Sequence, residues 1–247
     1  MGNRFKGRTY LVTGANAGMG KCVTQQLVSE GASLYLVDRN DSFIKGLAAD
    51  APDRIGYACF DLGQPERIPA LFEEAKRKGF RFDGLVYCAG ISPLMSLQEF
   101  DLDKTLLTYK INVISFISMV RFFADEAYTN PGASIVGISS NAAVYGGNRQ
   151  FVYSSTKAAM NLVVKSCVKE LAQRKTRINA IMPSVTNTEM VAELRKQSDA
   201  IDRNVQYKQP FGILDPDDIA KNVLYLLSDD SLSISGIALP VNNGEVY

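Results

Sequence analysis

The sequence contains no histidine among its 247 residues. The side chain that most often transfers protons in enzymes near neutral pH is therefore missing. Any acid–base chemistry in this protein must depend on other groups, such as tyrosine, lysine or carboxylates.

Net charge is also nearly absent. The chain has 27 Lys and Arg residues against 26 Asp and Glu residues, a formal charge of +1. This balance gives no electrostatic reason to expect nucleic acid or an anionic membrane as a partner, and we predict neither. There is no apolar run of membrane-spanning length and no signal or transit peptide, so we expect a cytoplasmic protein.

Cysteine is scarce and scattered, and no C-x-x-C pair occurs. We expect Cys22, Cys59, Cys88 and Cys167 to be reduced and mostly buried thiols of a cytosolic protein. We predict no metal site.

Three residues in the second half of the chain predict chemistry. Tyr153 and Lys157 are four residues apart in a helical pattern, so they share one helix face. An ammonium beside a phenol favours the phenolate and lowers the pKa of the phenol. Ser140 could hold a reacting oxygen against this phenol. Although Tyr-x-x-x-Lys alone is common on solvated helix faces, the three together indicate acid–base chemistry on a hydroxyl or carbonyl.

A second motif lies near the N-terminus. Residues 9–13 predict a buried strand, residues 21–30 predict a helix, and three glycines at 14, 18 and 20 lie between them. A strand, a glycine turn and a helix form the context of a dinucleotide-binding fingerprint, here spaced G-x-x-x-G-x-G. Asp38 ends the next strand, where a carboxylate can accept hydrogen bonds from a ribose diol.

Strand and helix patterns alternate along the whole chain. We expect one α/β domain over residues 1–247, a Rossmann-type doubly wound parallel sheet of about seven strands flanked by helices on both faces. The expected strands lie near 9–13, 33–38, 55–60, 83–88, 134–139, 177–182 and 237–241. The expected helices lie near 19–30, 41–49, 64–78, 100–127, 150–174 and 216–228.

In this order, the motifs make the chain similar to the short-chain dehydrogenase/reductase family, in its branch of about 250 residues. The gap from Ser140 to Tyr153 fits the family and selects Ser140 over Ser139. The resemblance runs from end to end, through Thr13-Gly14-x-x-x-Gly18-x-Gly20, Asp61-Leu62, Ala89-Gly90, Asn112, Ser140, Tyr153, Lys157, Asn179-Ala180-x-x-Pro183, Thr188 and Ser235-Gly236.

The resemblance assigns roles to these positions. It implies catalysis by Ser140, Tyr153 and Lys157, with Asn112 linking Lys157 to solvent through a water. It implies that Asp61 and Leu62 contact adenine. The implied cofactor-binding residues are Thr13, Gly14, Asn16, Ala17, Gly18, Met19, Gly20, Asp38, Arg39, Asp61, Leu62, Ala89, Gly90, Tyr153, Lys157, Pro183, Thr186 and Thr188. The chain departs from the family at Cys88, usually Asn, and at Ser184, usually Gly.

The cofactor can be argued from charge. Asp38 would face the 2′-phosphate of NADP at close range, a contact between like charges. NADP-preferring relatives often have a basic residue before Gly18, where this chain has Ala17. We therefore predict NAD(H), with NADP(H) left possible because Arg39 could reach a phosphate.

The predicted function is an NAD(H)-dependent oxidoreductase that interconverts a secondary alcohol and a ketone, with Tyr153 as general acid and base. One alternative is an NADPH-dependent 3-oxoacyl-carrier-protein reductase, and another is a non-catalytic nucleotide-binding regulatory protein. The candidate substrate contacts are Ser92, Asn141, Tyr145, Asn148 and Arg149, with a lid near 189–211.

Self-association is the last expectation. The family pairs through two long helices, here near 100–127 and 150–174. Both helices carry more apolar positions than one buried stripe needs, which favours a homotetramer, with a homodimer as the alternative. The apolar positions that carry this argument are Phe116, Ile117, Met119, Val120, Phe122 and Phe123.

Overall fold

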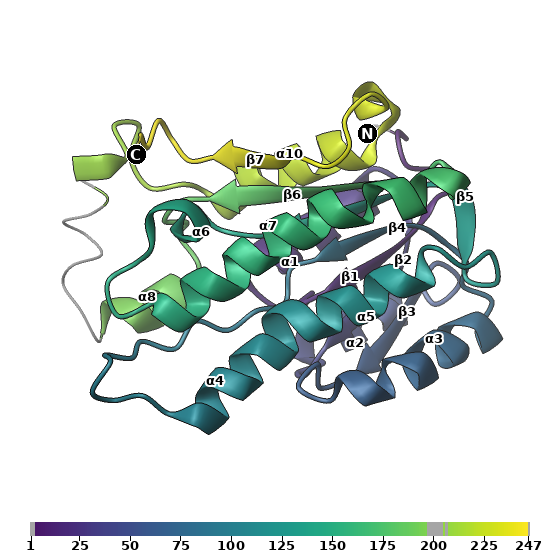
Figure 1. Ribbon diagram of the computed structural model, residues 1–247. Helices are drawn as coiled ribbons and strands as arrows, with labels where there is room; N and C mark the ends of the chain where they lie inside the picture. The colour runs from purple at the N-terminus through teal and green to yellow at the C-terminus, as the bar shows by residue number, and fades with distance from the viewer. Residues whose placement is uncertain (1–2, 197–204, 206, 247) are drawn as a thin grey trace.

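The computed structural model describes residues 3–196, 205 and 207–246. Within these ranges, seven parallel strands form one sheet in the order β3-β2-β1-β4-β5-β6-β7 (Figure 1). The strand order reverses between β1 and β4, and in such sheets ligands bind outside the carboxyl ends of the strands. The strands are β1 (Thr9–Thr13), β2 (Ser33–Asp38), β3 (Ile55–Cys59), β4 (Phe82–Tyr87), β5 (Thr129–Ile138), β6 (Arg177–Pro183) and β7 (Ala238–Val241).

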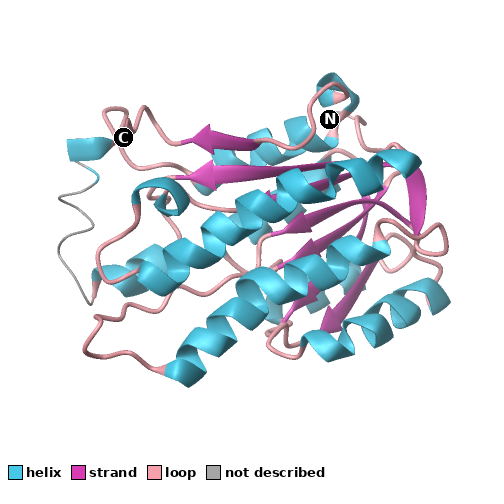
Figure 2. Cartoon of the chain, in the orientation of Figure 1, coloured by secondary structure: helices cyan, strands magenta, loops and turns pink. Residues whose placement is uncertain are grey.

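Helices cover both faces of the sheet, as Figure 2 shows. One face packs against α3 (Ile68–Arg77), α5 (Ser115–Phe122) and α7 (Phe151–Leu171). The other face packs against α1 (Gly18–Ser29), α2 (Ser42–Asp50) and α10 (Pro216–Leu227). Because both faces are covered, the central strands are continuously apolar, and Tyr10, Leu11 and Val12 of β1 are fully buried. The predicted doubly wound α/β fold is confirmed.

Three further helices lie toward the carboxyl ends of the strands (Figure 1). They are α4 (Leu102–Tyr109), α6 (Ala142–Tyr145) and α8 (Glu189–Arg195). The sequence patterns did not predict α6 or α8. Both are short, and a short helix has too few positions to show a helical period.

The helix predicted over residues 100–127 is wrong as a single element. The chain forms α4, then a π-helical turn (Lys110–Ile114), then α5, which ends at Phe122. Beyond α5 the Asp125 carboxylate accepts a hydrogen bond from the Ala127 N–H, a local turn that competes with the helix. Strand β5 then begins at Thr129, earlier than predicted.

The apolar cluster that suggested self-association is mostly used inside the subunit. Phe116, Met119, Val120, Phe122 and Phe123 are all buried against the subunit's own sheet. Ile117 remains 44% exposed. The cluster therefore gives little support to the expected tetramer.

The lid expected near 189–211 is described in part. Its first residues form α8, and residues 207–211 follow the gap. Residues 197–204 and 206, the middle of the predicted lid, lie outside the described residues.

The thiols are more exposed than expected. All four cysteines are free, with Cys59 exposed and Cys22, Cys88 and Cys167 half-buried. No described helix is long and apolar enough to cross a membrane. Within the same residues, no group of three or more His, Cys, Asp or Glu side chains is arranged to hold a metal ion.

Candidate active site

The glycine turn after β1 has no room for side chains. Gly14 has φ +65°, and a Cβ there would lie 2.8 Å from the Ala89 backbone nitrogen. A Cβ on Gly20 would lie 2.1 Å from the Gly14 carbonyl oxygen. The turn therefore closes tightly on itself and on the end of β4, which needs glycine at both positions.

Asp38 is fixed at the end of β2 by two backbone donors. Its carboxylate accepts from the N–H of Asn16 at 3.0 Å and from the N–H of Asn40 at 3.1 Å. The Asn16 side chain accepts in turn from the N–H groups of Phe43 and Ile44, at the start of α2. Asn16 thus joins the glycine turn to both β2 and α2.

A cavity of about 150 Å³ gathers the residues expected around adenine and ribose. Three of its lining residues, Phe60, Ile91 and Ile111, were not predicted. They are apolar residues next to predicted positions, so nothing in their type distinguished them from core residues. The predicted residues that line this cavity are Gly14, Asp38, Arg39, Asp61, Leu62, Ala89 and Gly90.

Thr13 does not reach this cavity. Its side chain is fully buried, and its hydroxyl accepts a hydrogen bond from the Ala89 N–H at 3.3 Å. The Thr13 side chain is therefore engaged within the sheet, and its role in cofactor binding stays a prediction. Thr13 holds the ends of β1 and β4 together.

The N-terminus of α1 is occupied by a carboxylate from a distant segment. Ala17 precedes the helix without a side-chain cap, and the Gly18 N–H donates to Glu189 Oε2 at 3.0 Å. Thr188 caps α8 and also lies near Gly18. An anionic oxygen thus sits where free N–H groups and the helix dipole favour negative charge.

Ser140 and Tyr153 line a second cavity of about 280 Å³. Tyr153 is on the first turn of α7, and its phenol lies near enough to the Ser140 hydroxyl for that hydroxyl to affect its pKa. Ser139 is buried and donates to the Lys157 carbonyl. The structure therefore agrees with the choice of Ser140 over Ser139.

Lys157 is buried, and its ammonium donates to the Ile138 carbonyl at 2.7 Å. Burial lowers the pKa of Lys157 to about 8. Its Nζ lies 5.6 Å from the centroid of the Tyr153 ring. The two side chains therefore lie close together, as their spacing predicts.

The pKa of Tyr153 does not follow the simple expectation. Burial raises this pKa, and the Ser140 hydroxyl only partly opposes the increase. Lys157 does not lower the pKa in this arrangement, because its ammonium is directed at the Ile138 carbonyl. In the protein alone, Tyr153 is a protonated phenol near neutral pH, ready to act as an acid.

Asn112 lies in the π-helical turn and is fully buried. Its amide contacts both backbone groups of Ile91 and the Thr156 hydroxyl, at 2.9–3.0 Å. A Cβ on Gly90 would lie 3.3 Å from Asn112 Oδ1 and 3.4 Å from Lys157 Nζ. The three residues therefore meet beside the dinucleotide cavity, where the resemblance placed the proton path.

The loop after β6 follows the expected course. Pro183 ends the strand, and Thr186 is buried, with its hydroxyl donating to the Ser184 carbonyl at 3.0 Å. The Thr186 side chain is thus used within the loop. Thr188 is the better placed of the two threonines for a ligand, because it lies beside the glycine turn.

Four of the five predicted substrate residues line the cavity of Ser140 and Tyr153: Ser92, Tyr145, Asn148 and Arg149. The Arg149 guanidinium is also paired with Glu99 at 2.7 Å. Asn141 is fully buried and is not among the lining residues, so its predicted contact with substrate is not supported.

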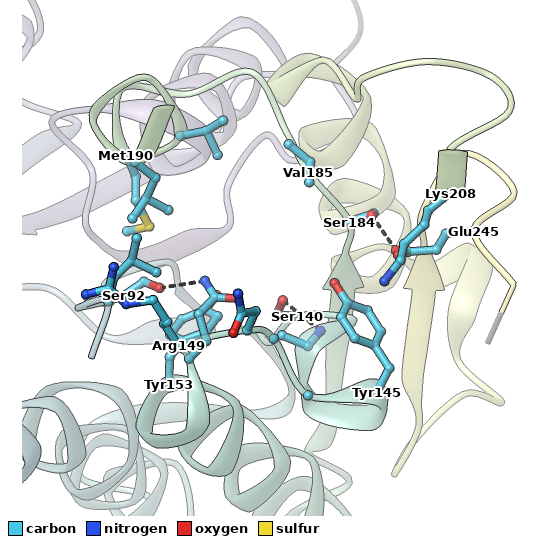
Figure 3. A pocket seen from close by; sticks show the side chains of 18 of the residues that line it. Ser92, Ser140, Tyr145, Arg149, Tyr153, Ser184, Val185, Met190, Lys208 and Glu245 are labelled. Atoms are coloured by element: carbon cyan, nitrogen blue, oxygen red, sulfur yellow. Dashed lines mark hydrogen bonds between the residues drawn. The ribbon is translucent and has the colours of Figure 1, made fainter. Parts of the chain in front are cut away.

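Sequence reasoning missed Glu245 in the wall of this cavity, whereas Met190 and Lys208 belong to the lid predicted near 189–211. Figure 3 shows Lys208 and Glu245 at one end and Ser92 and Met190 at the other, with Ser140 between them. Glu245 follows β7 and is only 6% exposed. It belongs to no motif, and only the fold brings it to Ser140.

Both departures from the family pattern have a place in the site. Ser184 lines the cavity, and its hydroxyl donates to the Glu245 carboxylate. Cys88 follows β4 beside the glycine turn, and burial raises the pKa of its thiol to about 12. The Cys88 thiol therefore stays neutral at physiological pH.

A family model described as "Enoyl-(Acyl carrier protein) reductase" matches residues 14–245. The 3-oxoacyl-(acyl-carrier-protein) reductase of Thermotoga maritima is 28% identical to this chain. The alignment covers 98% of this chain and 99% of the relative. The D-erythrulose reductase of Gallus gallus is 29% identical, with 97% of this chain and 96% of the relative covered.

Solved structures agree. A Brucella melitensis structure titled as a short-chain dehydrogenase/reductase, "Glucose/ribitol dehydrogenase", superposes with a TM-score of 0.91 at 26% identity, over the full length of both chains. The chain belongs to the short-chain dehydrogenase/reductase family of oxidoreductases.

Proposed function

We propose that the protein is an NAD(H)-dependent oxidoreductase that interconverts a secondary alcohol and a ketone. One observation carries the proposal. Tyr153 and Ser140 open into one cavity, while Lys157, Asn112 and Gly90 meet beside the neighbouring dinucleotide cavity. A substrate oxygen held by Ser140 and Tyr153 would thus lie next to the dinucleotide site.

The described residues fit a nicotinamide dinucleotide. The Gly18 N–H already donates to an anionic oxygen, that of Glu189, and the dinucleotide cavity is lined by Asp38 and by small residues at the end of β4. Gly14 and Gly20 keep side chains away from this path. When bound, the nicotinamide would supply the acceptor or donor of hydride.

The residues of this chain supply the proton chemistry. The Ser140 hydroxyl donates to the substrate oxygen and stabilises charge that develops there. Tyr153 gives its proton to the oxygen in reduction and takes the alcohol proton in oxidation. Lys157, with a pKa of about 8, exchanges protons near neutral pH and returns Tyr153 to its starting state.

The substitution Tyr153→Phe tests this assignment. We expect turnover to fall by about 10²–10⁴-fold, the usual contribution of a positioned acid–base group. Affinity for the dinucleotide should stay close to wild type. Absorbance of the reduced nicotinamide would be followed with secondary alcohols, polyols, hydroxysteroids and 3-hydroxyacyl thioesters. Turnover near the wild-type rate in Tyr153→Phe would disprove the role of Tyr153.

The choice of NAD rests on Asp38. Its carboxylate would meet the 2′-phosphate of NADP, and contacts between like charges cost several kcal/mol. We expect Asp38→Ser to lower the ratio of kcat/KM for NAD to that for NADP by about tenfold or more. A wild-type enzyme that already prefers NADP would contradict this interpretation of Asp38 and give Arg39 the role of a phosphate contact.

An NADPH-dependent 3-oxoacyl-carrier-protein reductase remains the second candidate, because the 3-oxoacyl-(acyl-carrier-protein) reductase of Thermotoga maritima is similar over 98% of this chain. An acidic carrier protein would need free basic residues for docking. Arg174 is a basic residue near the end of the helix region 150–174, but its guanidinium donates to the Thr129 carbonyl and lies 3.8 Å from Glu126. Activity only with NADPH and acyl thioesters would establish this alternative. A protein that binds dinucleotide but turns over nothing would support the regulatory alternative.

We also propose self-association, as a homotetramer or homodimer, through the outer faces of α4, α5 and α7. Leu106, Ile117 and Leu162 on these helices are 50%, 44% and 64% exposed. Light scattering coupled to size exclusion would measure the mass in solution, and a monomer would contradict the proposal.

A further inference from the structure

Glu245 is a buried carboxylate in the wall of the substrate cavity. Its side chain follows β7, is 6% exposed and lines the same cavity as Ser140 and Tyr153. Removing a carboxylate from water is costly unless hydrogen bonds compensate. Its hydrogen-bond partners therefore show which of its two oxygens still lacks a donor.

One oxygen of this carboxylate is occupied. Glu245 Oε2 accepts from Asn141 Nδ2 at 2.7 Å and from the Ser184 hydroxyl. Asn141 directly follows Ser140, and Ser184 directly follows the end of β6. The carboxylate is thus attached to the same two segments that form the catalytic wall.

The backbone around Glu245 is also held. Its N–H donates to the Asn242 carbonyl at 3.1 Å, and Asn242 Nδ2 donates to the Glu245 carbonyl at 2.8 Å. Asn243 Nδ2 ties the turn to the Gly212 carbonyl at 2.9 Å. The position of the carboxylate is therefore built by the turn and is not an accident of a free side chain.

The second oxygen, Oε1, has no donor among the described residues. Lys208 is the cation in the same cavity, but its ammonium lies over the Tyr145 ring, 4.4 Å from the centroid. In the described part of the chain no salt bridge joins Lys208 to Glu245. Oε1 is not among the buried side-chain atoms of the described residues that lack a partner, so it is open to the cavity that Glu245 lines. An acceptor that faces a cavity without a donor is a position that a ligand hydroxyl can fill.

The charges around the cavity indicate that the ligand group that donates to Glu245 is neutral. The charges of Lys208 and Glu245 cancel within the cavity, and Arg149 is neutralised by Glu99. A cationic ligand would gain from Glu245 but would be repelled by Lys208, and an anionic ligand would meet the reverse. A cavity of about 280 Å³ is just below the usual range for small-molecule sites, so the substrate is small.

We infer that the substrate is a small, neutral, polyhydroxylated alcohol or its ketone, and that Glu245 accepts a hydrogen bond from a hydroxyl beyond the reacting carbon. The inference rests on the proposed function and adds the substrate class to it. Glu245 acts here as a specificity residue, since Ser140 and Tyr153 carry the reaction.

The test is Glu245→Gln with three matched substrates. The amide oxygen must face the two donors Asn141 and Ser184, so the amide nitrogen faces the cavity and offers a donor where an acceptor was. The substrates are butane-2,3-diol, butan-2-ol and 3-aminobutan-2-ol, which differ only in carrying a hydroxyl, a hydrogen or an ammonium at the neighbouring carbon. Glu126→Gln, at an exposed carboxylate remote from the cavity, is the control variant.

We expect Glu245→Gln to lower kcat/KM for the diol by about 10- to 100-fold, the effect of losing a hydrogen bond to a charged group. The value for butan-2-ol should stay within about twofold, and Glu126→Gln should change neither. An equal loss with the diol and butan-2-ol would show a structural role and overturn the inference. A wild-type preference for the amino alcohol over the diol would also overturn it, because the donor would then be a cation.

Ligand binding separates this inference from the proposed function. The diol should raise the melting temperature of the wild-type protein in the presence of NAD, because it binds only the folded state. It should not do so for Glu245→Gln. If this binding is seen but no alcohol is oxidised, the hydroxyl contact of Glu245 stands as a ligand contact and the proposed function fails. If butan-2-ol is oxidised and the diol has no advantage in rate or binding, the function stands and the inference fails.

Discussion

The two ends of the active-site crevice are built from the chain in different ways. The dinucleotide half comprises residues 14–20, 38–39, 60–62 and 89–91, which follow β1 to β4 in order. The substrate half comprises residues 140–153, 184–194, 208 and 245, with Ser92 and Leu94. The first half is built from short turns that follow successive strands, and the second uses side chains brought together from distant segments.

This difference decides what each half tolerates. In the dinucleotide half, Gly14 and Gly20 leave no space for a single methyl group. In the substrate half, a side chain such as Glu245 can be exchanged while the backbone stays in place. Changes in the first half should therefore affect folding and cofactor together, whereas changes in the second should affect substrate choice.

Lys157 stands between the halves and should give the largest effect on stability. Burial lowers its pKa from 10.5 to about 8, so between these pH values the unfolded chain binds the proton more strongly. Stability from this group therefore rises with pH across the window, by about 3 kcal/mol, and is constant below it. Urea unfolding of wild type and Lys157→Met at several pH values would measure the difference.

The expected result is a free energy of unfolding that rises with pH for wild type relative to Lys157→Met. The Ile138 carbonyl loses its donor in the variant, but that cost is independent of pH and cancels in the comparison. A difference between the two proteins that does not change across the window would contradict a buried ammonium at this position.

The next largest effect should come from Gly20→Ala in the dinucleotide half. Its Cβ would lie 2.1 Å from the Gly14 carbonyl, so we expect a loss of about 1–3 kcal/mol of stability and weaker dinucleotide binding. Gly46→Ala is the matched control. Gly46 is in α2 with nothing within 4 Å of its Cβ, and alanine there should stabilise by about 0.5–1 kcal/mol. Chemical unfolding and NAD titration would measure both, and equal effects would refute the steric argument.

Glu189→Gln should give the smallest effect, and it tests the hydrogen bond that joins the two halves. Glu189 belongs to α8 on the substrate side but accepts from the Gly18 N–H in the dinucleotide half. A pyrophosphate would compete for this N–H with the carboxylate. We expect the amide variant to bind NAD about two- to fivefold more tightly, from the usual energy of an anion at a helix N-terminus. Calorimetry would show it, and weaker binding would mean that Glu189 helps to hold the cofactor.

The sequence predicted the dinucleotide half in more detail than the substrate half. Strand ends at Thr13 and Asp38 were placed correctly because buried parallel strands are short apolar runs followed by polar residues. The glycine turn then follows from chain connectivity alone. The bond from the Ala89 N–H to the Thr13 hydroxyl was not predicted, since no pattern tells whether a hydroxyl at a strand end faces the cavity or the neighbouring strand.

The substrate half could be predicted only where a motif supplied it. Ser140 and Tyr153 were identified from spacing, and Lys208 lies in the predicted lid. The place of Glu245 depends on how the chain after β7 packs, which is a long-range property. The helix after Leu102 was extended too far for a related reason. Apolar residues up to Phe123 continue the helical pattern, yet the chain must leave the helix to begin β5 at Thr129.

The unequal exposure of the thiols has a practical use. Burial raises the pKa of Cys22 to about 11 and of Cys88 to about 12, and raises the pKa of Cys167 as well, so these three react slowly with electrophiles at neutral pH. Cys59 is exposed, ends β3 and donates from its sulfur to the Arg39 carbonyl. A maleimide fluorophore should therefore attach at one position, next to the adenine cavity, and give an optical signal of dinucleotide binding without any engineered cysteine.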